Sequence, residues 1–131
     1  MSAPYNQQVE LAALLTAAAL PTDPEVASRY TPPYRYILGA DPWLAAGQTT
    51  GQWVGRFRVV CVTAPGTTDV QAAQLANMTR AVILALRGTR FAVQGVAVTQ
   101  PSEMATGSGT SLGASVNVAT PISRAEFEGE D

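Results

Sequence analysis

The segment 53–88 constrains the fold most, because it places an alternating strand, a turn and an amphipathic helix in direct succession. Residues 53–63 are predicted to form a strand, since apolar and polar side chains alternate along them. Arg56 and Arg58 occupy the polar phase. The apolar phase comprises Trp53, Phe57, Val59 and Cys61. We therefore expect one face of this strand to be buried.

A helix is predicted to follow, after the Pro65–Gly66 turn signal. Thr68 and Gln71 have the spacing of a capping box, in which each side chain bonds the backbone of the other residue. Gly88 is expected to end the helix in the left-handed conformation. The apolar stripe comprises Ala72, Leu75, Thr79, Val82, Ile83 and Leu86. Burial of each large aliphatic side chain contributes roughly 1.5–3 kcal/mol, so this helix should lie on a sheet containing the preceding strand.

The composition indicates one domain with hidden surface. A chain of 131 residues suits a single domain. Apolar residues make up 47% of it and charged residues only 14%, against about 25% charged in typical soluble domains. So little charge suggests that part of the surface contacts partners. The net charge of −2 and the lack of a basic cluster argue against tight binding to nucleic acid.

Several kinds of chemistry are excluded by residue type. All eight basic residues are arginine, so lysine nucleophiles, histidine bases and histidine metal ligands are absent. Leu112 stands where a dinucleotide fingerprint beginning at Gly107 needs its third glycine. The single cysteine, Cys61, permits no internal disulfide and is expected to be a buried thiol. We predict no catalytic, cofactor-binding or metal-binding residue, and no enzyme activity.

The first 52 residues are predicted to contain one helix and one long connector. Asn6 is a candidate cap for a helix over 7–19, which Pro21 would end. This helix is too short to span a membrane, and its apolar stripe comprises Leu11, Leu14, Leu15 and Ala18. Residues 21–52 read as a largely irregular connector, with only 35–38 as a short strand. Its aromatic residues, Tyr34, Tyr36 and Trp43, are either interface anchors or a cap over the core.

The remaining residues predict a hairpin and an acidic tail. Strands over 90–99 and 111–120 should pair antiparallel, with a bulge near Gly95 and Met104 near the tip. Pro121 is expected to end the second strand. Residues 123–131 carry four acidic side chains around Phe127, which is a candidate for docking on a neighbouring subunit.

The order of these elements resembles the small tail terminator proteins of long-tailed bacteriophages, particularly those infecting GC-rich actinobacteria. An alanine-rich helix and a proline-rich connector come first. They are followed by Trp53-x-x-Arg-Phe-Arg-Val-Val-Cys-Val62, a helix over 69–87, a strand, a tip and the closing strand 112–122. The resemblance covers nearly the whole chain (N-terminal helix 1–20, connector 21–52, core 53–122, tail 123–131), although it includes no diagnostic motif.

This resemblance implies an α+β fold with two helices on one side of a sheet of about four strands, mainly antiparallel, with a long β-hairpin arm. It also implies a virion protein of the tail and neck, made in the host cytoplasm and without cofactor or membrane contact. Such a protein forms a ring, usually hexameric, between the tail tube protein and the head connector or stopper, and DNA passes through without sequence-specific binding.

The expected interface residues are Trp43, Arg56, Arg58, Met104 and Phe127. A head-completion ring is the alternative within the same neck region, whereas a tail tube subunit would need more strands. A small-ligand binding module with Tyr34, Tyr36, Trp43 and Trp53 as pocket walls is the alternative from another class.

Overall fold

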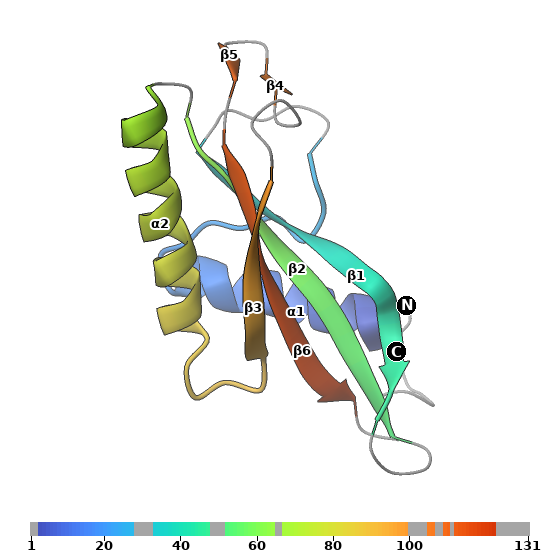
Figure 1. The fold of residues 1–131 in the computed structure, drawn as a ribbon. Coiled ribbons are helices and arrows are strands. Elements are labelled where there is room, and N and C mark those ends of the chain that lie inside the picture. The colour runs from blue at the N-terminus through green and yellow to red at the C-terminus, as the bar shows by residue number, and fades with distance from the viewer. Residues whose placement is uncertain are drawn as a thin grey trace.

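The chain folds into two helices and a four-stranded antiparallel sheet (Figure 1). The computed structural model describes residues 3–27, 33–47, 52–64, 67–99, 105–106, 109–110 and 112–122. The helices are α1 (Ala3–Ala17) and α2 (Thr68–Ala85). The strands are β1 (Tyr34–Ala46), β2 (Trp53–Val62), β3 (Ala92–Thr99), β4 (Ala105–Thr106), β5 (Gly109–Thr110) and β6 (Gly113–Ile122). The predicted α+β class is confirmed.

The main sheet has the order β1-β2-β6-β3, so the closing strand of the chain lies inside it. β3 and β6 form the predicted long hairpin, and its register shifts between Val93 and Gly95, where a bulge was expected. The short strands β4 and β5 pair farther out along the same hairpin (Figure 1). On its other side β6 pairs with β2 along ten residues, from Trp53 opposite Ile122 to Val62 opposite Gly113.

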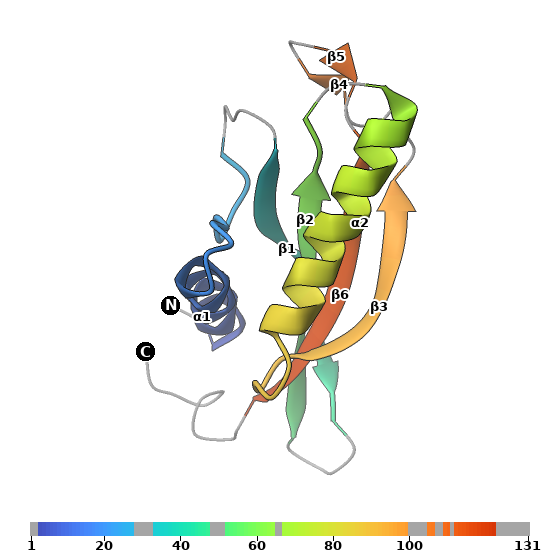
Figure 2. The ribbon, with the colours of Figure 1, turned by 90° about the vertical axis from the view of Figure 1, so that its left-hand side faces the viewer.

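Both helices pack on the same face of this sheet, as expected (Figure 2). Cross-strand partners in an antiparallel sheet point to the same side, and the partners Ile37, Val59 and Val116 all point toward the helices. The buried cluster includes residues from both helices and from the sheet. They are Leu11 and Leu15 of α1, Leu75, Met78 and Val82 of α2, Leu86 at the end of α2, Phe57 and Cys61 of β2, Phe91 directly before β3, and Val118 of β6. Met78 belongs to this cluster although the predicted stripe omitted it.

β1 corrects the prediction of an irregular connector over 21–52, because it is a strand of 13 residues. In the sequence, Gly39 and Pro42 are typical of a loop. In the structure they fall in a register shift between Gly39 and Leu44, within a strand at the edge of the sheet. Proline is tolerated at sheet edges and bulges because no ladder hydrogen bond is lost there. Pro42 is therefore compatible with a continuous strand.

The predicted start of the first helix is also corrected. α1 begins at Ala3, so Asn6 lies inside the helix and does not cap it. Pro4 favours the earlier start, since proline fits the first turn of a helix, where its missing N–H is not needed. The helix ends at Ala17, two residues before the predicted end.

The capping box predicted for the second helix is wrong. The cap residue is Thr67, and no side-chain hydrogen bond caps the helix. The Gln71 side chain instead donates to the carbonyl of Ala64 at 3.3 Å, and Gln74 Oε1 accepts the N–H of Ala64 at 2.9 Å. Both glutamines thus bind the chain that leaves β2. Gly88 is left-handed as expected, with a φ of 73°, but the helix ends at Ala85 with Leu86 as its C-cap, two residues before the predicted end.

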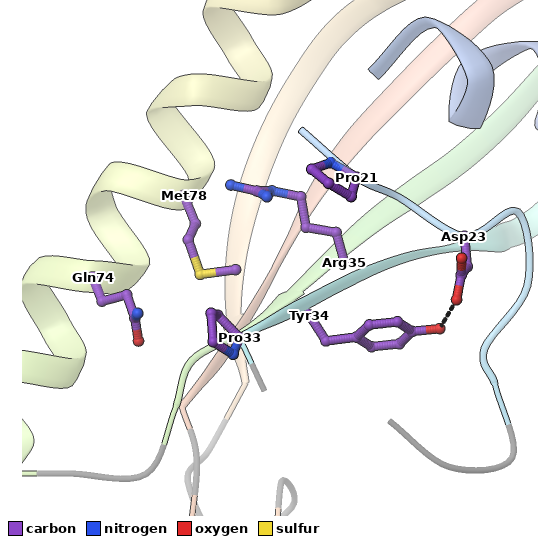
Figure 3. Close-up of a pocket in the computed structure, with 7 residues that line it drawn as sticks. All are labelled: Pro21, Asp23, Pro33, Tyr34, Arg35, Gln74 and Met78. Carbon is purple, nitrogen blue, oxygen red and sulfur yellow. Dashed lines mark hydrogen bonds between the residues drawn. The ribbon is translucent and has the colours of Figure 1, made fainter. Parts of the chain in front are cut away.

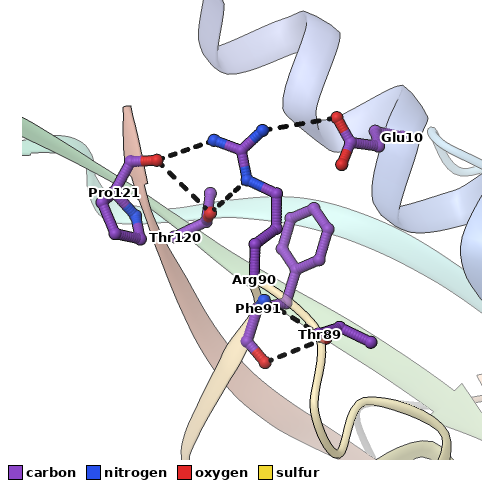
Figure 4. A network of polar contacts seen from close by, with 6 residues as sticks. All are labelled: Glu10, Thr89, Arg90, Phe91, Thr120 and Pro121. Atoms are coloured by element: carbon purple, nitrogen blue, oxygen red, sulfur yellow. Dashed lines mark hydrogen bonds and ion pairs between the residues drawn. The ribbon is translucent and has the colours of Figure 1, made fainter. Parts of the chain in front are cut away.

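Arg90 connects the end of β6 to α1 (Figure 4). Its Nε donates to Thr120 Oγ1 at 2.9 Å and its Nη2 to the carbonyl of Pro121 at 2.7 Å. Its Nη1 lies 3.5 Å from Glu10 Oε1. Pro121 does not end the strand as predicted, because β3 pairs with β6 only as far as Ala119. β2 still pairs with β6 here, but on the β3 side no strand of the described residues requires the missing N–H, and the Arg90 side chain donates to the Pro121 carbonyl.

Replacement of Phe57 by alanine should destabilise the fold strongly. The ring is fully buried in the sheet, and it packs so closely that a Cβ added at Gly55 would lie 3.1 Å from Phe57 Cζ. Loss of the ring should lower the free energy of unfolding by about 3–5 kcal/mol. Urea denaturation measures this, with Val70→Ala as the control. Val70 is 64% exposed, so its truncation should change stability by less than about 0.5 kcal/mol.

Candidate functional site

The predicted contact residues do not form one surface. Met104 and Phe127 lie outside the described residues. Trp43 is 37% exposed. Its indole lies where a side chain at Gly39 would be, because a Cβ added there would come within 2.7 Å of the ring. Gly39 is the cross-strand partner of the buried Phe57. The indole therefore lies on the helix-facing side of β1.

The two predicted arginines lie on the opposite side of the sheet. Arg56 and Arg58 alternate with Phe57, so both point away from the helices. Arg58 is exposed, and Arg56 Nη1 donates to the carbonyl of Pro42 at 3.4 Å. This face is not uniformly solvated, since Val60 and Val62 are buried on it. Trp43 and the arginines consequently cannot contact a flat partner together.

The aromatic residues predicted to line a ligand pocket are also separated. The rings of Tyr34 and Tyr36 stack, with centroids 5.5 Å apart. The Tyr34 hydroxyl donates to Asp23 Oδ2 at 2.6 Å and accepts the N–H of Ala27 at 3.0 Å. Of the four residues proposed as pocket walls, Tyr34 borders a cleft of about 390 Å³, whereas the other three border neither that cleft nor the apolar groove described below.

The sequence interpretation missed the outer edge of β3. β3 pairs with β6 on one side and forms the end of the main sheet on the other. Its eight residues, Ala-Val-Gln-Gly-Val-Ala-Val-Thr, include no charge and no proline. Natural proteins protect edge strands with charges, prolines or bulges, because an open backbone edge can pair with another chain. β3 has the bulge at Gly95 but neither of the other two devices.

An apolar groove runs beside this edge. It has a volume of about 270 Å³ and lies between α2 and the strands β3 and β6. Its lining residues are Ala72, Leu75, Ala76, Thr79, Val96, Leu112 and Ala114. Val96 is 45% exposed and Val93 is 36% exposed, both on the helix-facing side of β3. The valines of this surface are visible in the sequence, but their exposure depends on the position of β3 at the edge of the sheet, which the sequence interpretation did not predict.

The opposite edge of the sheet is protected. Asp23 forms a parallel bridge with Tyr36 of β1, in which Ile37 donates to the Asp23 carbonyl at 3.0 Å. Farther along β1, Asp41 and Pro42 lie in the register shift and supply a charge and a proline. All three protective devices are therefore present on β1. The edge most open to pairing with another chain is β3.

Cys61 is a buried thiol, as expected. Burial raises its pKa to about 11, from an ordinary value of 9.0, and the nearby positive charge of Arg35 acts in the opposite direction. The thiol is therefore protonated and unreactive near neutral pH. Its position in the core indicates a role in packing and not in catalysis.

The described residues contain no group of three or more potential metal ligands. Among the same residues, no helix is long and apolar enough to cross a membrane. No protein-family model matches the chain, and no curated protein is significantly similar to it in sequence. Function must therefore be argued from the surfaces described above.

The Cys61 thiol should make stability depend on alkaline pH. The unfolded thiol loses its proton above about pH 9, whereas the folded thiol keeps it until about pH 11. The folded state thus binds more protons in this range, so stability falls as pH rises. The loss should approach about 2 kcal/mol near the upper end. Urea denaturation of the wild type and Cys61→Ala measures it. The variant should show a shallower decline, and parallel declines would contradict the prediction.

Proposed function

We propose that this protein is a structural subunit of a bacteriophage neck, which caps the tail tube and joins it to the head connector as an oligomeric ring. The proposal combines a physical argument for self-association with the family resemblance of the sequence. The argument for self-association supports an oligomeric assembly, and the family resemblance supports its location in the virion.

The observation that carries the proposal is the unprotected edge of β3 beside an apolar groove. A strand of eight uncharged residues with exposed valines is a hazard for aggregation unless a specific partner covers it. A partner strand added at this edge would satisfy its backbone groups, and an apolar side chain would fill the groove. Pairing of two β3 edges would give an isologous dimer, whereas addition of a different segment of a neighbouring copy to β3 is a heterologous contact. Heterologous contacts close into rings when the rotation permits, so the proposed ring requires the second kind of contact.

The other surfaces are consistent with a subunit that has several neighbours. The exposed large apolar residues include Val9 and Leu84 on the two helices, Val26 in the chain after α1, and Trp43 on β1. The net charge of −2 suits a ring through which DNA passes without being retained. Trp43, Arg56 and Arg58 remain proposed contacts. Because they lie on different faces, they would touch different neighbours.

The head-completion ring remains the second candidate. The same edge and groove would serve a ring on either side of the junction between head and tail. The position in the virion must therefore be tested genetically.

A charge placed at the β3 edge should prevent ring formation. Val96→Glu introduces a carboxylate into the groove at a residue already 45% exposed, so the fold should tolerate it while a partner strand should not. Light scattering after size-exclusion chromatography measures the mass of the particles, and circular dichroism checks the fold. The matched control is Val70→Glu, whose site is 64% exposed and does not line the groove. Equal masses for both variants would exclude the β3 edge as the interface.

A stop codon early in this reading frame should yield DNA-filled heads beside unattached tubes of irregular, excessive length. These particles are expected because a tube without a terminator continues to grow. Negative-stain electron microscopy of the lysate distinguishes the candidates. Leaking heads beside tails of normal length would indicate the head-completion role, and normal joined particles would exclude both structural roles. Expression of the chain from a plasmid should restore infectious particles.

A further inference from the structure

A polar cleft of about 390 Å³ opens on the helix side of β1, away from the groove at β3. It is bordered by Pro21, Asp23, Pro33, Tyr34, Arg35, Gln74 and Met78. The residues come from three segments: the chain after α1, the start of β1 and the middle of α2. Its volume lies within the range of about 300–1,000 Å³ typical of small-ligand sites.

Arg35 points into the helix-facing layer of the protein. It occupies the same strand phase as Ile37, which is fully buried, and it pairs across the sheet with Cys61. Figure 3 shows its guanidinium extending toward α2 and Met78. The Asp23 carboxylate lies at the other end of the group, beside the Tyr34 hydroxyl to which it is bonded (Figure 3).

The positive charge of Arg35 has no counterion among the described residues. The side chain is half-buried, and its Nε atom is buried without a hydrogen-bond partner. The ion pair that the structure records in its described part belongs to Arg90 and Glu10. Cys61 does not neutralise the guanidinium, because burial raises the pKa of the thiol to about 11. A partly buried charge without compensation is unfavourable for folding, so its retention here requires another explanation.

The surroundings of Arg35 supply further features of a binding site. Gln74 Oε1 already accepts the N–H of Ala64, so the amide N–H groups remain as donors on the α2 side. Pro21, Pro33 and Met78 provide apolar walls, whereas the Tyr34 ring extends away from Arg35 toward Asp23 (Figure 3). A guanidinium with apolar walls matches a carboxylate borne on a partly apolar body, since arginine binds carboxylates through two parallel hydrogen bonds.

We infer that this cleft is a carboxylate-binding site in which Arg35 supplies the positive charge and Met78 and the prolines hold the apolar body. The carboxylate belongs either to a free organic acid or to an acidic side chain of another protein. The chemistry at Arg35 is the same in both cases. This inference concerns a different surface from the proposed ring contact and does not depend on it.

Titration of the full-length protein with phenylacetate, followed by calorimetry, tests the inference. Phenylacetamide has the same body without the charge and should not bind. A capped tripeptide, acetyl-Ala-Glu-Ala-amide, carries only a side-chain carboxylate, so it distinguishes a protein source from a free acid. Saturable binding of either acid and none of the amide would support the site. Absence of saturable binding by both acids, or equal binding of the amide, would overturn it.

Variants of Arg35 separate binding from folding. Arg35→Met should weaken carboxylate binding by about tenfold or more, whereas the thermal unfolding midpoint should be unchanged or raised because an uncompensated charge is removed. Arg35→Lys should restore part of the affinity, since lysine keeps the charge but loses the planar fork. Arg58→Met, on the opposite face, is the matched control and should bind as the wild type. Full binding by Arg35→Met, or a lowered midpoint without any loss of affinity, would contradict the assignment.

Discussion

The area that two helices can cover is the constraint on which the rest of this structure depends. A helix with its side chains is about 10 Å wide, and neighbouring strands are about 4.8 Å apart, so one helix covers about two strands. Here α1 contacts β1 and β2, and α2 contacts β2 and β6. The helices overlap on β2, and β3 is left beside α2 without a helix above it (Figure 2).

This unequal coverage accounts for the main surfaces of the molecule. Phe57, Val59 and Cys61 of β2, where both helices contribute, are fully buried, as are Ile37 and Val116 on the neighbouring strands. The valines of β3 have the same apolar phase but remain exposed, and the space between them and α2 is the apolar groove. At the other side of the helix layer, the chain after α1 and the middle of α2 border the Arg35 cleft. The apolar groove therefore lies at the outer margin of the helix layer, and the Arg35 cleft lies where the chain after α1 faces α2.

The predictable parts of the fold are those encoded locally. The alternation in β2, the spacing in α2 and the glycine after it were sufficient to predict a strand, a helix and, to within two residues, its end. β1 was misread because Gly39 and Pro42 are loop signals when only neighbouring residues are considered. They are tolerated because this strand lies at an edge, which is a property of strand order. The capping box failed similarly, since the Gln71 amide donates to the Ala64 carbonyl, which is a partner outside the motif. Arg35 stands in phase with Ile37, a usable sign of an inward-pointing charge. The cleft around it joins residues about forty positions apart, which no spacing rule relates.

The central position of β6 also determines how the molecule carries mechanical load. The hydrogen bonds of an antiparallel ladder run perpendicular to the strands, so a pull along the hairpin axis loads the ten-residue pairing of β6 with β2 in shear. All of these bonds resist together, whereas peeling would break them one at a time. At the far end of β6, Arg90 links Thr120 and Pro121 to Glu10 of α1. Force applied at the hairpin is thus distributed over the sheet and into the helix layer.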